Sequence, residues 1–76
     1  MEISLDRLRP GMNAQVTEIA CKPALCKRMA DFGLVEGTKL ECCYRSGDGG
    51  VVALRLRGST IAIRRGDLRR CRGRLL

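Results

Sequence analysis

Apolar and polar residues alternate along much of the chain, and this period of two predicts β-strands. Residues 12–19 place Met12, Ala14 and Val16 on one face, with polar side chains between them. Such alternation is typical of a strand with one buried and one solvated face. We expect further strands over residues 38–45, 51–58, 59–65 and 69–76.

The predicted inner faces of these strands carry the apolar side chains of the core. Val52, Leu54 and Leu56 share one face of their segment, and Ile61 and Ile63 share the inner face of the next. Gly58-Ser59 between these two segments predicts a tight hairpin, and the glycine-rich run at 46–50 predicts a second turn.

One segment breaks the alternation and predicts a short helix over residues 23–33. Leu25, Met29 and Phe32 follow at i, i+4 and i+7, so they share one side of a helix. Pro23 suits the first turn, and Gly33 suits the left-handed position that ends a helix, after which Leu34 can pack back onto the last turn. Single turns are expected at residues 5–8 and 65–68.

About five short strands and one inserted helix in 76 residues indicate one domain, residues 1–76, of mainly β class. Strands of this length curl into a small barrel, because an open flat sheet would leave its edges unpaired. A chain this short has room for only a small core.

The basic residues are unevenly distributed. Residues 50–76 hold eight arginines against Asp67 alone, for a net charge of +7, whereas residues 1–49 are neutral. The arginines alternate with aliphatic residues and therefore lie on solvated faces. They indicate an acidic protein partner first, then a merely solvated face or nucleic acid. Phe32 and Tyr44 both fit core positions, which leaves no stacking platform and makes nucleic acid the less favoured partner.

The five cysteines predict packing rather than chemistry. There is no histidine, and adjacent Cys42 and Cys43 point to opposite faces of a strand unless a bulge intervenes. We expect Cys42 in the core, Cys43 exposed, all five as thiols, and no metal ligands or cofactor. A catalytic function lacks candidates, because no nucleophile has a base beside it and no pair of carboxylates is placed to share a pocket.

No stretch of the sequence has the form of a secretory signal or of a membrane-spanning helix. We therefore expect a cytoplasmic protein without membrane insertion.

The order of these features resembles the FeoA family, the small proteins of bacterial and archaeal ferrous iron uptake. The resemblance runs from LDRLRPGMNAQVTEI through KRMADFGLVEGTKLEC to VALRLRGSTIAIRRGDL, with Met29, Phe32, Gly33, Leu34 and Gly37 on the signature at the end of the helix. The chain departs from the family in Glu36 and Gly49, which stand where prolines are usual, and in its basic C-terminal end.

The resemblance implies an SH3-like barrel with an inserted α-helix and a non-catalytic role. It further implies docking on the cytosolic G-protein part of a FeoB-like membrane transporter, at the inner face of the membrane, with weak self-association left open. On that interpretation the exposed Lys27, Arg28, Arg64 and Arg65 are the expected partner contacts. The alternatives are a small basic barrel that binds nucleic acid, and a sensor that binds Fe(II) or Zn(II) through its cysteines.

Overall fold

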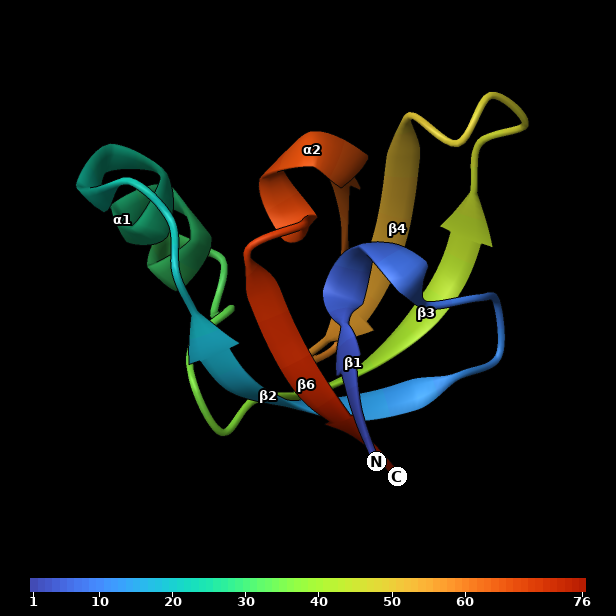
Figure 1. Ribbon diagram of the computed structural model, residues 1–76, viewed down its shortest axis with the longest axis horizontal. Helices are drawn as coiled ribbons and strands as arrows, with labels where there is room; N and C mark the ends of the chain where they lie inside the picture. Colours follow the sequence, from blue (N-terminus) through green and yellow to red (C-terminus); the bar gives the residue numbers. More distant parts are fainter.

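The alternating segments form six antiparallel strands of one strongly curled sheet (Figure 1). The computed structural model describes residues 1–76. Along the sheet the order is β1-β6-β2-β3-β4-β5, so the last strand lies between the first two. The strands are β1 (Glu2–Ser4), β2 (Asn13–Ile19), β3 (Lys39–Arg45), β4 (Val51–Leu56), β5 (Ser59–Arg64) and β6 (Cys71–Leu75).

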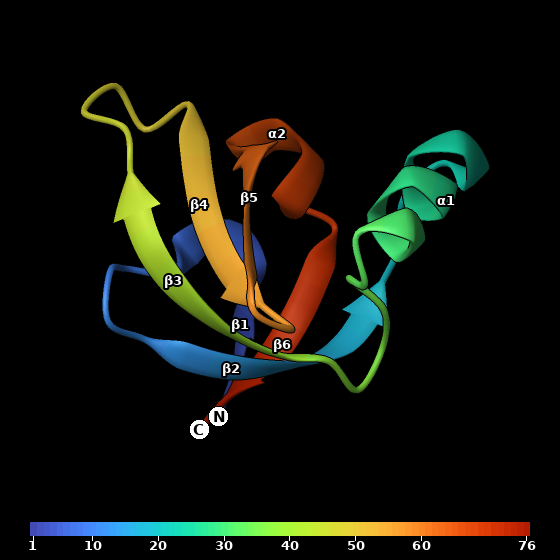
Figure 2. The ribbon, with the colours of Figure 1, turned by 180° about the vertical axis from the view of Figure 1, so that it is seen from behind.

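Three helical segments complete the fold: the 3-10 turn η1 (Leu5–Arg7), the helix α1 (Pro23–Asp31) and the single turn α2 (Arg65–Leu68). Figures 1 and 2 both show α1 to one side of the barrel, while η1 and α2 lie next to each other over the curled sheet. Neither α-helix has the length and apolar character needed to cross a bilayer.

The five predicted strands and the predicted helix are present, and the mainly β class is confirmed. The sequence missed β1, which has only three residues and therefore shows no usable alternation. Its pairing with β6 joins Ile3 to Gly73. The strand therefore depends on a partner 70 residues away rather than on its own pattern.

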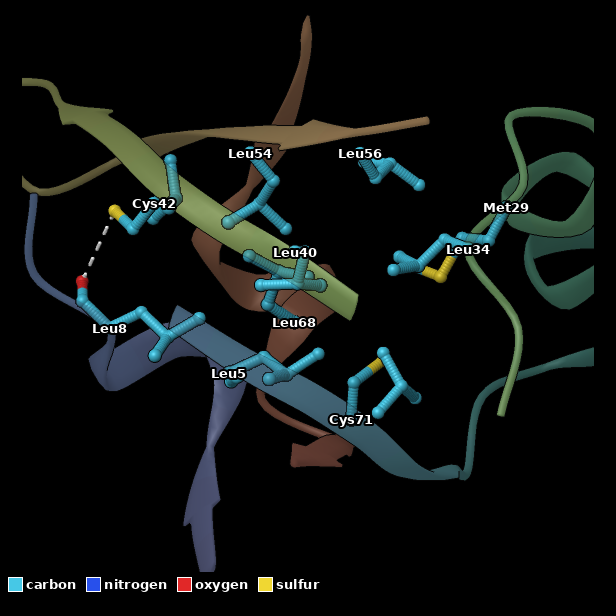
Figure 3. Close-up of a cluster of buried hydrophobic side chains, with 13 residues drawn as sticks. Leu5, Leu8, Met29, Leu34, Leu40, Cys42, Leu54, Leu56, Leu68 and Cys71 are labelled. Atoms are coloured by element: carbon cyan, nitrogen blue, oxygen red, sulfur yellow. Dashed lines mark hydrogen bonds between the residues drawn. The ribbon is translucent and has the colours of Figure 1, made fainter. Parts of the chain in front are cut away.

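The inward faces of the strands enclose a core of 13 buried apolar residues (Figure 3). Leu5 and Leu8 enter it from η1 and its C-cap, Leu68 from α2, and Leu54 from the sheet. Met29 and Leu34 reach it from the α1 side, so a few apolar contacts anchor the helix to the barrel. The predicted inner face of β4 (Val52, Leu54, Leu56) is buried as expected.

A β-bulge in β3 overturns the prediction for Tyr44. Cys42 pairs with Leu54, but Tyr44 pairs with Ala53. A step of two residues in β3 therefore lies opposite a step of one residue in β4. The extra residue shifts the alternation, and Tyr44 is 56% exposed instead of buried. Cys42 is buried and Cys43 exposed, as predicted.

The β4–β5 hairpin turns one residue earlier than the sequence indicated. Leu56 pairs with Ser59, which leaves Arg57 and Gly58 as the two loop residues. Their φ angles are 50° and 78°, the positive values that a tight turn between twisted strands requires. Ser59 is therefore the first residue of β5 rather than part of the turn.

Candidate docking groove

A groove of about 410 Å³ lies where α1 approaches β5 and α2. Its lining residues lie in two parts of the sequence, one before β3 and one after β4, and only the fold brings these two parts together. The lining residues are Lys22, Ala24, Leu25, Arg28, Met29, Phe32, Ala62, Ile63, Arg64 and Asp67.

The floor of the groove is apolar. Met29 is buried, and Leu25 and Ile63 are half-buried against the core. Phe32 is 52% exposed, contrary to the prediction that it packs inside. A groove with an apolar floor and an exposed aromatic side chain has surface to offer an apolar partner residue.

The end of α1 explains why Phe32 stays outside. The helix ends at Asp31, and Phe32 is its C-cap. Gly33 then has φ +88°, a left-handed conformation that reverses the chain, and the Leu34 N–H donates to the Met29 carbonyl at 2.9 Å. Leu34 therefore occupies the core position that the helical period assigned to Phe32.

Basic side chains form the rim. Lys22, Arg28 and Arg64 are exposed and line the groove from opposite sides. Arg64 Nε lies 3.8 Å from Asp67 Oδ2, a loose surface pair, whereas Lys22 and Arg28 make no ion pair. The rim thus has unpaired positive charge next to apolar surface, an arrangement that suits an apolar side chain flanked by carboxylates.

The four predicted contact residues do not form one cluster. Arg28 and Arg64 line the groove together, although 36 positions separate them in the sequence. Lys27 is exposed on α1 but lies outside the lining. Arg65 is directed elsewhere, with its Nε 3.6 Å from Asp6 Oδ2.

The sequence missed Lys22 and Phe32 as parts of this surface. Lys22 is the N-cap of α1, directly before Pro23, and that position was its only signal. Phe32 was assigned to the core by its spacing alone.

The cysteine prediction is wrong for one pair. Cys21 and Cys26 form a disulfide, with their Cα atoms 5.8 Å apart. The first turn of α1 brings the two positions together, because Cys26 lies inside the helix and Cys21 just before it. The disulfide thus closes the first turn of the helix that forms one wall of the groove.

The other three cysteines are free, and the two buried ones lie at separate places in the core. Burial raises the pKa of Cys71 to about 11, and it also raises the pKa of Cys42. Thiols held protonated in this way are poor nucleophiles and poor ligands. No three His, Cys, Asp or Glu side chains are grouped as a metal site would require.

Comparisons with protein families and with solved structures agree with one another. The family model described as FeoA domain matches residues 3–72. No curated protein matches the chain. Among solved structures, the FeoA protein of Chlorobium tepidum is similar with a TM-score of 0.91 and 30% identity, over 97% of this chain and 70% of that one.

More distant structures share the fold. The FeoA of Stenotrophomonas maltophilia, described as a prokaryotic SH3 domain protein complexed with zinc, has a TM-score of 0.71 and 19% identity, over 91% of this chain and 86% of that one. The IdeR protein of T. acidophilum has a TM-score of 0.88 and 16% identity, with 99% of this chain aligned to 34% of that one. The barrel is thus an SH3-like fold that also occurs within larger proteins.

Proposed function

Because the chain belongs to the FeoA domain family, whose role lies in ferrous iron transport, we propose that it is a non-catalytic accessory protein that docks on a FeoB-like transporter. The docking site is the groove between α1 and β5, and the partner is the cytosolic G-protein part of the transporter. The protein then acts in the cytoplasm, at the inner face of the membrane, by biasing the assembly or nucleotide cycle of its partner.

The observation that carries the proposal is that one groove combines an apolar floor with a rim of exposed basic side chains, of which Arg64 alone has a loose ion pair, with Asp67. Phe32 and Ile63 offer apolar surface, while Arg28 and Arg64 flank it. Arginine pairs with carboxylates through two parallel hydrogen bonds and fixes the orientation of a partner. The expected partner segment therefore presents an apolar side chain between acidic residues.

The description of the Stenotrophomonas maltophilia relative supports a modulating role, since it names that protein as a candidate activating factor of ferrous iron transport. A nucleic-acid function gains nothing from the two exposed aromatic residues. Phe32 lines the groove at the end of α1, and Tyr44 lies on β3 and is not part of that groove. Phe32 does lie among basic side chains, but with Tyr44 outside the groove it is a single aromatic, whereas a surface that tracks a nucleic-acid strand stacks successive bases on several aromatic side chains.

The test is a titration of the labelled chain with the cytosolic domain of the FeoB from the same genome, with and without guanine nucleotide. We expect saturable binding that Arg28→Glu and Arg64→Glu each weaken about tenfold or more, because each replaces an attraction by a repulsion. Lys27→Glu, outside the lining, should have a smaller effect.

Lys39→Glu is the matched control, since Lys39 is exposed on β3 and does not line the groove. Binding that all charge reversals weaken equally would contradict a defined groove. Binding to an oligonucleotide but not to the transporter domain would replace the proposal with the nucleic-acid function. Light scattering in the same buffers measures any self-association.

A further inference from the structure

Four arginines surround a second hollow that the docking function does not use. Arg7, Arg9, Arg45 and Arg65 line this hollow, which has a volume of about 820 Å³. They come from η1, from the connection to β2, from the end of β3 and from the start of α2. Three of them belong to residues 1–49, whose net charge is zero, so only the fold brings the four together.

One carboxylate, that of Asp6, pairs with one of these four guanidinium groups. Its Oδ2 lies 3.6 Å from Arg65 Nε, while its Oδ1 accepts a hydrogen bond from Ser4 Oγ. Asp48, in the turn after β3, is occupied by Ser46 Oγ at 2.6 Å and by the Gly50 N–H at 2.9 Å, and it does not line the hollow. The hollow therefore has an excess of about three positive charges by simple counting.

Two of the arginines are held in place by the fold. Arg45 Nη1 donates to the backbone carbonyls of Asp6 at 2.9 Å and Leu8 at 2.7 Å, which fixes its guanidinium beside η1. Arg65 is held by its ion pair with Asp6. Its Nε is buried and has no hydrogen-bond acceptor, while 41% of the side chain faces solvent. Part of the donor capacity of each group is unused.

The other two arginines are free to move onto a ligand. Arg7 and Arg9 are exposed, and neither makes an ion pair or a side-chain hydrogen bond. Two fixed and two mobile guanidinium groups combine a preformed anchor with groups that can close over an anion. Guanidinium groups match phosphoryl oxygens in geometry and stay charged at every physiological pH.

We propose that this hollow binds a chain of two or three phosphoryl groups. A single phosphate carries a charge of only about −1.5 to −2, which is less than the excess of about three positive charges, whereas a chain of two or three phosphoryl groups carries enough negative charge to balance the four arginines that line the hollow. These phosphoryl groups can belong to free polyphosphate or to a nucleotide, because the arginines recognise the phosphoryl groups that both share. This site is separate from the docking groove, since no lining residue is common to the two.

The test is calorimetric titration of the full chain with tripolyphosphate, with sodium sulfate at equal ionic strength as the reference. We expect saturable binding of one tripolyphosphate per chain and at least tenfold weaker binding of sulfate. Arg9→Gln should weaken tripolyphosphate binding about tenfold and leave the fold unchanged, because the Arg9 side chain has no partner within the protein.

Arg45→Gln should weaken binding further but also removes two hydrogen bonds to η1, so circular dichroism must accompany it. Arg70→Gln is the matched control, since Arg70 is exposed and lies outside the hollow. Equal losses in Arg9→Gln and Arg70→Gln would overturn the proposal in favour of general charge attraction, as would the absence of saturable binding.

Titration with ATP separates the two sources. Binding that is tighter than that of tripolyphosphate and still depends on Arg9 assigns the site to a nucleotide. Equal or weaker binding that depends on Arg9 assigns it to the phosphoryl chain alone. Arg28→Glu, which disrupts the docking groove, should leave both titrations unchanged, so the two proposals fail independently.

Discussion

At the scale of single residues, close packing around Gly73 leaves no room for a side chain. Gly73 lies in β6, at a position where the strand pairs with β1 on one side and with β2 on the other. A Cβ atom at Gly73 would lie 2.9 Å from the Gln15 carbonyl oxygen and 2.9 Å from Leu5 Cδ2. The backbone oxygen cannot move aside without breaking the β2–β6 pairing, so this glycine is required by space.

Gly73→Ala should therefore destabilise the protein by about 1–3 kcal/mol, the usual cost of overpacking a core. Urea unfolding followed by circular dichroism measures the loss as a lower midpoint. Gly47→Ala is the control, because a Cβ there meets nothing within 4 Å. Equal stability of the two variants would contradict the close approach of Gly73 to Gln15 and Leu5.

The three free thiols should differ sharply in reactivity. Cys43 is exposed, whereas Cys42 and Cys71 are buried and burial raises the pKa of both. Without reductant, Ellman's reagent at pH 8 should label one thiol rapidly in the native protein and three after unfolding. Cys43→Ser should abolish the rapid phase. Rapid labelling of two or more native thiols would contradict the buried positions.

At the scale of elements, α1 depends on few restraints. Met29 and Leu34 anchor its C-terminal end in the core, and the Cys21–Cys26 disulfide closes its N-terminal turn. The helix has nine residues, too few to be stable on its own. The core anchors thus hold the C-terminal end of this wall of the groove, and the disulfide restrains its N-terminal turn.

Replacing both cysteines of the disulfide by serine should lower the free energy of unfolding by about 2 kcal/mol, the loop-entropy value for so short a ring. The loss should appear first in α1, as faster amide hydrogen exchange over residues 23–31, and transporter binding should weaken with it. Wild-type protein in reductant is the matched comparison. Unchanged exchange in α1 would mean that its core anchors suffice.

At the scale of the whole molecule, charge opposes folding. The chain has 15 basic and 8 acidic residues, and its four ion pairs all involve exposed or half-exposed arginines. Exposed pairs contribute only about 0–1 kcal/mol each. Repulsion among the remaining arginines therefore outweighs them at low ionic strength.

The melting temperature should accordingly rise by several degrees as sodium chloride increases from about 0.02 to 0.3 M, because the Debye length shortens from about 20 Å to about 6 Å and screens the repulsion. Thermal unfolding followed by circular dichroism measures it. Chloride is the required anion, since tripolyphosphate or sulfate would also report on the arginine hollow. A fall in the melting temperature would mean that the ion pairs dominate.

The sequence by itself determined the local elements. Five strands, α1 and the inner face of β4 follow from periods of two and 3.6, because these periods decide which side chains are buried together. The left-handed end of α1 also follows, since Gly33 meets a requirement that is local to the chain. The resemblance to the FeoA family rested on the order of these same elements.

Only the tertiary structure decided which distant residues meet. β1 exists because β6 pairs with it, and one extra residue in β3 turned Tyr44 outward. Arg28 and Arg64 came to face one groove, while Arg65, next in the chain, joined Arg7, Arg9 and Arg45 at another. Contacts between strands and across layers depend on register and curvature, which no periodic pattern along a single segment contains.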